Sequence, residues 1–332
     1  MDQKGSGMEA VIIATNRVND FLRWLDQWQA RFLEERVSVY SMVDTHDEAD
    51  TNRIRIASIN GQAFDHSDAK GTLRSSSWII PERTCACKSL AVYRAWKDGA
   101  ERIYCLDDDC YPLEVENWVK EHRTRLTSAV HNRVWPTAIK PRPRGIPYMD
   151  MSPVGLNHGL WAGHADVDAT THLLYGDTMG DSPNTTIIPH GALFPFCGMN
   201  WGCRREVAPL MYFGLHGPSW GVDRFDDIWC GWLMKKCLDH LGYAVTSGMP
   251  FIRHIRASDP FVNIEKEAPG YRMNCDLWRF AMDLRVWGKT APECILSVSE
   301  QMSRWAENQA KREYWKKYAE ALSVWASLFK EE

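Results

Sequence analysis

Residues 102–110 read Arg-Ile-Tyr-Cys-Leu-Asp-Asp-Asp-Cys, a short apolar run that ends in three consecutive carboxylates. The run predicts a buried strand, which places Asp107, Asp108 and Asp109 at its C-terminal tip. Open α/β sheets bind their ligands at that edge. Three adjacent like charges repel, and such a group of hard oxygen ligands suits Mg²⁺ or Mn²⁺ carrying a diphosphate. An acidic turn that faces solvent is the alternative this stretch leaves open.

Strands and helices alternate around this motif over the first 125 residues. Apolar runs predict two further strands, and apolar stripes of 3.6-residue period predict helices. The expected strands are 11–15 and 37–43, and the expected helices are 21–33, 85–96 and 115–125. This alternation predicts an α/β fold with a parallel sheet and crossover helices. No glycine-rich dinucleotide or P-loop motif accompanies it.

The rest of the chain gives weaker signals. Residues 45–80 are polar and irregular, with weak strand signals, and residues 126–200 are rich in Pro, Gly and His, which predicts loops around a site. The weak strands are 54–56 and 78–80, and helices are expected at 205–212 and 226–240. Residues 298–329 have the apolar spacing of one long amphipathic helix or a pair of helices packed on the body.

Composition limits the classes of function. The 332 residues are 45% hydrophobic and 25% charged, as in an ordinary globular protein, and the net charge of −4 does not favour polyanion binding by the whole molecule. Ten cysteines form no zinc pattern. Without a secretory signal or an 18-residue apolar run, we expect reduced thiols, a cytoplasmic location and no membrane span.

Two further groups could carry chemistry. Asp226 and Asp227 form an acidic pair at a predicted helix start, where the helix dipole alone favours them, but either carboxylate could bind a sugar or deprotonate a hydroxyl. His158 precedes Trp161 in a His-Gly-Leu-Trp stretch, where the tryptophan could stack on a sugar or base and the histidine could donate a hydrogen bond to it. Packing is the simpler explanation for Trp161.

A third group is Arg253-His254-Ile255-Arg256. A neutral histidine can complete a metal shell begun by carboxylates, and Arg253 and Arg256 could stabilise a diphosphate leaving group. Together with the acidic triplet, these residues predict a divalent metal that bridges the diphosphate of a nucleotide sugar while the glycosidic carbon is attacked.

Longer motifs in the same order resemble the plant reversibly glycosylated polypeptides, or UDP-arabinopyranose mutases, of glycosyltransferase family 75. The resemblance covers nearly all of residues 10–285. The matching stretches are Val11–Arg17, Asp20–Leu22, Asp44, Cys85–Cys87, Leu106–Cys110, Ser152–Pro153, His158–Trp161, Leu193–Asn200, Met211–Leu215, Arg224–Trp232 and Ala257–Asn263.

This resemblance implies a GT-A-type, Rossmann-like mixed sheet flanked by helices. It implies a UDP-sugar as donor and Mn²⁺ or Mg²⁺ as cofactor. By this resemblance, Thr15, Arg17 and Asp44 would hold the uridine. Asp107, Asp108 and Asp109 would hold the metal and the ribose–diphosphate, and His254 would complete the metal shell. Asp226 and Asp227 would face the sugar and the acceptor. The glycosyltransferase domain would span residues 8–290, followed by a C-terminal amphipathic helical segment at 291–332.

One segment departs from the family pattern. The family becomes glycosylated on an arginine in a segment like Arg-Glu-Gly-Val-Pro, just before the His-Gly-Leu-Trp motif. Here residues 148–153 read Tyr-Met-Asp-Met-Ser-Pro, and Arg142 and Arg144 are displaced from that place. The resemblance therefore implies nucleotide-sugar binding without carrying over the glycosylated arginine.

Three functional hypotheses follow. The first is a transferase that moves the sugar to a separate acceptor hydroxyl. A local basic stretch suggests, as one such acceptor, a hydroxymethylated pyrimidine flipped out of DNA. The stretch consists of Lys120, Arg123, Arg125, Arg133, Lys140, Arg142 and Arg144.

The second hypothesis is a UDP-arabinopyranose mutase, or a self-glycosylating protein, that uses Arg144 or no covalent intermediate. The third is a non-catalytic subunit that binds the UDP-sugar. A homo-oligomer, with the amphipathic tail as its interface, is expected as a further property.

Overall fold

The computed structural model describes residues 7–45, 47–58, 60–114, 117–131, 144, 151–179, 184–255 and 259–329. Its strands are β1 (Glu9–Thr15), β2 (Val37–Val43), β3 (Gln62–Phe64), β4 (Arg102–Leu106), β5 (Cys110–Tyr111), β6 (Ala129–Val130), β7 (Ser152–Gly163), β8 (Thr186–Ile188), β9 (Asn200–Arg204) and β10 (Ala244–His254). Its α-helices are α1 (Val18–Glu35), α2 (Glu48–Ala57), α3 (His66–Leu73), α4 (Ser89–Lys97), α5 (Trp118–Leu126), α6 (Ala169–Tyr175), α7 (Asp226–Leu241), α8 (Pro260–Asp283), α9 (Ala291–Ala306) and α10 (Arg312–Ser327). Four 3₁₀ turns complete the described elements: η1 (Arg74–Ile79), η2 (Cys85–Lys88), η3 (Arg205–Leu210) and η4 (Pro218–Trp220).

The strands form one mixed sheet in the order β3-β2-β1-β4-β9-β7-β10-β5, with β6 and β8 paired to β7 and β10. The first four are parallel, as the strand–helix alternation predicts. β9 runs antiparallel to both β4 and β7, so it joins the N-terminal half of the sheet to the parallel pair β7–β10. The predicted α/β class with a central mixed sheet is confirmed.

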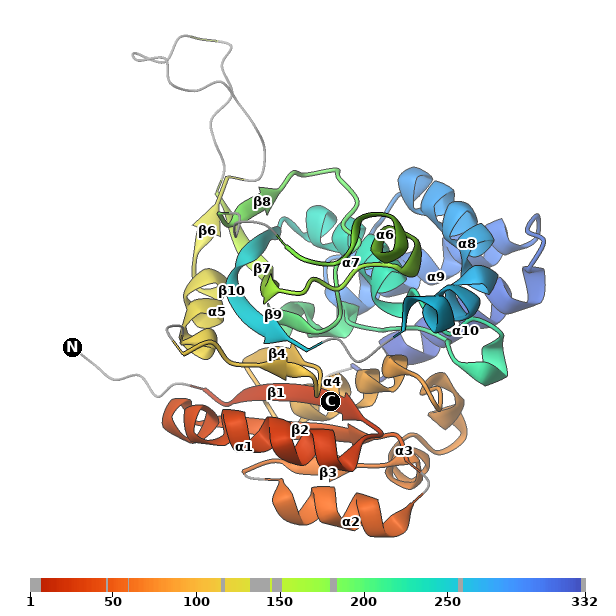
Figure 1. Cartoon of the computed structure of the whole chain (residues 1–332). Coiled ribbons are helices and arrows are strands. Elements are labelled where there is room, and N and C mark those ends of the chain that lie inside the picture. The colour runs from red at the N-terminus through yellow and green to blue at the C-terminus, as the bar shows by residue number, and fades with distance from the viewer. Residues whose placement is uncertain are drawn as a thin grey trace.

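Helices cover both faces of the sheet (Figure 1). On one face, α1 and α5 bury Phe21, Trp24, Trp28 and Trp118 in one apolar core. On the other face, α4 and α7 pack with the C-terminal helices in a second, larger core. Each core buries the apolar side of its amphipathic helices against alternate residues of the strands.

The C-terminal segment is a helical pair, one of the two arrangements that its periodicity predicts. α9 and α10 pack on each other and on the body, and the apolar face of α10 is buried. This face, which the sequence suggested as an oligomer interface, is therefore covered by the chain itself. No helix among the described residues is both long and apolar enough to cross a lipid bilayer.

Several predicted elements are wrong. Residues 54–56 lie in α2 rather than in a strand; Asp47 caps this helix and Ile56 is exposed. Residues 78–80 belong to or follow η1, and the helix expected at 205–212 is the shorter η3, which contains Pro209. The segment 126–200, predicted as loops, contains the twelve-residue β7. The sequence also missed the long helix α8.

Candidate functional site

A cavity of about 630 Å³ lies where the acidic tip of β4 meets the ends of β7 and β10, the start of α7 and part of α8. Seven of the predicted site residues line it. They are Arg17, Asp107, Asp109, His158, Asp226, Asp227 and His254. The topology brings them together because β4, β7 and β10 present their C-terminal ends on one side of the sheet, as strand-end sites require.

The first two acids of the triplet have separate partners. Asp107 Oδ1 accepts a hydrogen bond from Lys88 Nζ at 3.0 Å, and this lysine is buried in the cavity wall. Asp108 is buried beneath it, where Thr15 Oγ1 donates at 2.6 Å and the Arg17 guanidinium forms an ion pair with its carboxylate. Burial raises the pKa of Asp108 to about 6, against the opposing effect of Arg17. Asp108 therefore holds Arg17 in place from behind the cavity.

The third acid faces a histidine. Asp109 Oδ1 lies 4.0 Å from His254 Nε2, a separation too long for a hydrogen bond. His254 Nδ1 donates to the carbonyl of His164 at 3.3 Å, which leaves the Nε2 lone pair directed at Asp109. A backbone carbonyl behind the ring is the usual support of a metal-binding histidine. Burial, followed by the charge of Asp107, raises the pKa of Asp109.

The distance between these two atoms fits a metal ion. Ligands of one octahedral Mg²⁺ lie about 3 Å apart when adjacent and about 4.2 Å apart when opposite, because each is about 2.1 Å from the ion. Asp109 and His254, at 4.0 Å, lie near the spacing of opposite ligands, and their oxygen and nitrogen donors suit Mn²⁺ or Mg²⁺. β5 fixes the register, since His254 pairs with Cys110, and Ile255 N–H donates to the Asp109 carbonyl.

The second acidic pair begins α7. Each oxygen of Asp227 accepts one backbone hydrogen bond, from Gly198 N–H at 2.9 Å and from Ile228 N–H at 2.8 Å. Asp226, among the described residues, makes no side-chain hydrogen bond to another residue. Burial raises the pKa of Asp226 to about 6 and that of Asp227 to about 7. Asp226 is thus the carboxylate of this pair that can accept hydrogen bonds from a bound molecule.

The turn before this pair has an unusual backbone. Phe225 has a φ of 79°, in the left-handed region that aromatic residues rarely adopt. Its ring packs on Tyr271 of α8. Such outliers persist where the surrounding structure holds them and are frequent at functional sites.

His158 is buried in the cavity wall on β7. Its Nε2 accepts a hydrogen bond from Cys197 N–H at 3.3 Å, so Nδ1 carries the proton and donates to Ser247 Oγ at 2.9 Å. Burial lowers the pKa of His158 to about 3. Both nitrogens are occupied, and the ring therefore positions the 194–199 loop through Cys197 rather than offering a free acid or base.

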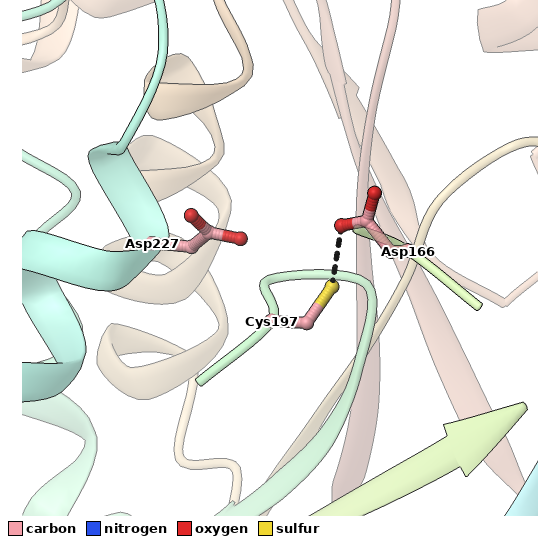
Figure 2. A group of neighbouring side chains, drawn as sticks. All are labelled: Asp166, Cys197 and Asp227. Carbon is pink, nitrogen blue, oxygen red and sulfur yellow. Dashed lines mark hydrogen bonds between the residues drawn. The ribbon is translucent and has the colours of Figure 1, made fainter. Parts of the chain in front are cut away.

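Asp166, Cys197 and Asp227 converge from three separate segments (Figure 2). Their ligand atoms all lie within 4.8 Å of one another, and the Cys197 thiol donates to Asp166 Oδ2 at 3.0 Å. The 194–199 loop thus contacts both the segment that follows β7, through Asp166, and the start of α7, through Asp227.

Several lining residues are not predicted from the sequence. Lys88 was missed because a lone lysine carries no pattern, although it follows the Cys85–Cys87 motif directly. Asp166 and Asp168 follow β7 as the triplet follows β4, so the strand-end rule could have found them had β7 been predicted. Glu267 on α8 accepts from Ala169 N–H and from the Tyr271 hydroxyl, which ties α8 to α6.

Four predicted residues lie outside the lining, and a fifth outside the described residues. Thr15 and Asp108 are buried behind Arg17. Asp44 accepts from His66 and from the backbone N–H groups of Arg83 and Thr84, so its carboxylate holds the chain's own loop. Arg253 is exposed over the Tyr111 ring, on the opposite face of β10 from His254. Arg256 is not among the described residues.

Two of the four described residues of the basic stretch, Arg123 and Arg125, form ion pairs, while Lys120 and Arg144 are exposed. Arg123 forms ion pairs with Glu9 and Glu35, and Arg125 pairs with Glu121. Arg133, Lys140 and Arg142 lie outside the described residues, as do residues 148–150 of the segment 148–153.

Comparison with known proteins gives one family across the whole chain. The family model described as "Reversibly glycosylated polypeptide" matches residues 6–332. The chain is 30% identical to probable UDP-arabinopyranose mutase 4 of Arabidopsis thaliana, over 97% of this chain and 90% of that protein. It is 29% identical to UDP-arabinopyranose mutase 1 of Oryza sativa subsp. japonica, with the same coverage.

Two glycosyltransferases are among the similar solved structures. Glucosyl-3-phosphoglycerate synthase from Mycobacterium tuberculosis, in complex with Mn²⁺, UDP and glucosyl-3-phosphoglycerate, matches with a TM-score of 0.46 and 11% identity, over 85% of this chain and 82% of that one. The mannosyltransferase PcManGT from Pyrobaculum calidifontis, in complex with GDP-Man and Mn²⁺, matches with a TM-score of 0.43 and 12% identity, over 100% and 90%.

Proposed function

The chain belongs to the reversibly glycosylated polypeptide family, and from this premise we propose that it is a metal-dependent enzyme that transfers a sugar from a UDP-sugar to a separate acceptor hydroxyl. The observation that carries the proposal is the supported His254 facing Asp109 across 4.0 Å. Asp109 and His254, with Asp107 beside them, would hold Mn²⁺ or Mg²⁺, which would neutralise the donor diphosphate. Arg17, held by Asp108 and Thr15, would bind the nucleotide end.

Asp226 supports the transfer chemistry. Its carboxylate is free to accept a hydrogen bond, and its raised pKa of about 6 suits a base that works near neutral pH. In the proposed step, the acceptor oxygen bonds to the anomeric carbon of the donor as the bond from that carbon to the diphosphate oxygen breaks. The acceptor proton passes to Asp226, and UDP leaves.

Binding measurements test the donor half directly. We expect UDP to bind the wild-type protein in the presence of Mn²⁺, measured by calorimetry, and to bind at least tenfold more weakly after chelation with EDTA. Asp109→Asn and His254→Ala should show the same loss even with Mn²⁺ present. His240→Ala is the matched control, because His240 is a surface histidine that contacts the Gly288 carbonyl. Equal UDP affinity in all four proteins would refute the metal assignment.

A second candidate is the mutase activity named in the plant relatives, which share about nine tenths of their length with this chain. It needs no external acceptor. Incubation with UDP-arabinopyranose or UDP-arabinofuranose alone distinguishes the two candidates: ring interconversion without an acceptor, detected by chromatography, favours the mutase, and acceptor-dependent release of UDP favours the transferase.

A further inference from the structure

Beyond the acidic tip of β4, the lining of the cavity has a strong excess of negative charge. Around the whole cavity, the described lining carries eight carboxylates and three permanently cationic side chains, those of Arg17, Lys88 and Arg224. Six of the carboxylates belong to one wall, formed by the loop after β7, the start of α7 and α8. We call this the acceptor wall: Asp166, Asp168, Asp223, Asp226, Asp227 and Glu267.

Little positive charge balances this wall. The Lys88 ammonium lies between the triplet and the α7 pair, but its hydrogen bonds already go to Asp107 and to the Gly198 carbonyl. Arg224 lines the same wall, but its guanidinium already pairs with Asp223 at 3.2 Å. A phosphate or carboxylate that entered here would face the remaining acids without a free cationic partner. Such juxtaposed like charges disfavour binding.

One aromatic ring is partly exposed in the same region. Trp161, Phe194 and Phe196 line the cavity beside the acids, but Trp161 and Phe196 are buried and only Phe194 is half-buried. Phe194 and Phe196 pack together with ring centroids 6.2 Å apart, and Phe194 packs edge-on against His158. Aromatic faces pack well on apolar C–H surfaces, while carboxylates accept hydrogen bonds from hydroxyl groups.

Two of the acids have oxygens to offer. Asp168 caps α6, and Glu267 is held by Ala169 and Tyr271, so these two carboxylates serve the fold. Asp166 is exposed and accepts one bond from the Cys197 thiol. Asp226 has no side-chain hydrogen bond to another described residue. Asp166 and Asp226 can therefore accept hydrogen bonds from hydroxyl groups of a bound molecule.

We propose that the acceptor is a neutral carbohydrate hydroxyl, bound by the carboxylates of the acceptor wall and the Phe194 ring beside them, and that anionic acceptors are excluded by charge. This inference rests on the proposed transfer from a UDP-sugar. It disfavours a phosphorylated sugar, a carboxylated sugar or the phosphate backbone of DNA inside this cavity.

Matched acceptors test the proposal. A panel of neutral methyl glycosides is compared with the 6-phosphates of its hexosides and with a duplex containing 5-hydroxymethylcytosine, using a panel of UDP-sugars and Mn²⁺. Release of UDP and the product mass are measured. We expect at least one neutral glycoside to accelerate UDP release, and its phosphate to lower kcat/KM at least tenfold. Equal or better use of the phosphorylated form, acceleration by the duplex alone, or no acceleration by any neutral glycoside would overturn the proposal.

A charge variant sharpens the result. Asp166→Lys reverses one exposed charge of the acceptor wall, and we expect it to narrow the preference for neutral over phosphorylated acceptor at least threefold. Asp26→Lys makes the same change on the exposed surface of α1 and should leave the preference unaltered. If Asp166→Lys kept the wild-type preference for neutral over phosphorylated acceptors, the acceptor wall would not be the source of that preference.

A separate binding measurement distinguishes failure of UDP-sugar binding from failure of the charge inference. Saturation-transfer NMR measures binding of the glycosides and their phosphates with and without UDP and Mn²⁺. If no UDP-sugar binds, the proposed function fails, and the preference of the free protein for neutral over phosphorylated saccharides still decides the charge inference. Stronger binding of the phosphates would overturn it.

Discussion

Lys88 is the residue that connects the two acidic groups of the cavity. Its ammonium contacts Asp107 at 3.0 Å and the Gly198 carbonyl at 3.1 Å, while the N–H of the same glycine contacts Asp227. A Cβ on Gly198 would lie 3.2 Å from Asp227 Cβ and 3.4 Å from Lys88 Nζ, so glycine lets the three groups approach. Burying a cation is costly, and here two clusters of carboxylates compensate for it.

Lys88→Met should separate metal binding from turnover. Removal of the ammonium leaves Asp107 negative and unpaired beside Asp109, and at an effective dielectric constant of about 20 a unit charge about 6 Å away changes a cation's energy by about 3 kcal/mol. We therefore expect Mn²⁺ to bind the nucleotide-free variant at least threefold more tightly, measured by electron paramagnetic resonance. Turnover should fall at least tenfold, because the Gly198 peptide and Asp227 lose their support.

Lys235→Met is the matched control for Lys88. Lys235 is equally buried and pairs with Asp239 and the Pro189 carbonyl, away from the cavity lining. Its loss should reduce thermal stability without changing Mn²⁺ affinity. Weaker Mn²⁺ binding in Lys88→Met than in wild type would contradict the electrostatic role and indicate a purely structural one.

At the scale of elements, the sequence predicts those that carry their own periodicity. β1, β2, β4 and α7 follow from local apolar runs and stripes. β7 does not, because Gly155, Asn157, His158 and Gly159 interrupt its apolar pattern. The polar side chains are tolerated only because other strands and helices satisfy them, which no local pattern records.

The candidate site divides in the same way. The triplet was found because three acids follow an apolar run, and its predicted position at a sheet edge is confirmed. Lys88 and Asp166 depend on contacts that form when distant segments meet, as Asp166 does with Cys197. Asp226 and Asp227 were found as a pair, but their different surroundings come from the fold: Gly198 occupies one and leaves the other free.

Helix α8 sets the position of the turn before Asp226. A Cβ on Gly270 would lie 2.5 Å from the Phe225 ring and 3.4 Å from Val222. Gly270→Ala should therefore displace Phe225, lower the free energy of unfolding by about 1–3 kcal/mol, and reduce turnover more than UDP affinity. Gly71→Ala on α3 is the control, since its Cβ would meet no atom within 4 Å. Equal losses of turnover and UDP affinity in Gly270→Ala would contradict this positioning.

A buried polar network joins α5 to the centre of the sheet and should make stability depend on pH. His122 Nδ1 accepts from Asn157 at 2.8 Å, and its Nε2 donates to Asn200 Oδ1 at 3.2 Å. Burial lowers the pKa of His122 from 6.5 to about 3. Between these values the unfolded chain binds a proton that the folded protein does not, so the contribution of this group falls as pH falls from 6.5 toward 3.

His122→Gln isolates this effect. Glutamine can replace both hydrogen bonds imperfectly and does not titrate, so the variant should be less stable than wild type at pH 7. The gap should narrow by about 2 kcal/mol between pH 7 and pH 5, at about 1.4 kcal/mol per pH unit below 6.5. Urea denaturation at the two pH values measures this gap, and a constant gap would show that folding does not lower the pKa of His122.

At the scale of the whole molecule, the C-terminal helical pair is part of the core rather than an appendage. Trp315, Tyr318 and Trp325 of α10 are fully buried. Trp325 packs on Tyr212 and Tyr93 and donates to the Pro209 carbonyl, and Trp315 packs on Trp229 of α7. Helix α7, which begins with Asp226, therefore packs against the C-terminal helical pair. The division predicted at residue 290 marks a change in architecture, and the contacts across it are those of a single core.

Truncation after residue 290 should for this reason prevent folding. Each buried aromatic side chain removes about 150–250 Å² from water, which is worth about 4–6 kcal/mol at 25 cal/mol per Å². An average domain is stable by only about 5–15 kcal/mol, so the loss of three such side chains would remove most or all of that stability.

Point variants test the same packing. Trp325→Ala should lower the free energy of unfolding by about 3–5 kcal/mol. Trp287→Ala, at a tryptophan that follows α8 and is 45% exposed, should change it by less than about 1 kcal/mol. Circular dichroism and urea titration of the three proteins give the comparison. A truncated chain that melted cooperatively at the wild-type temperature would show that residues 8–290 fold as an independent domain.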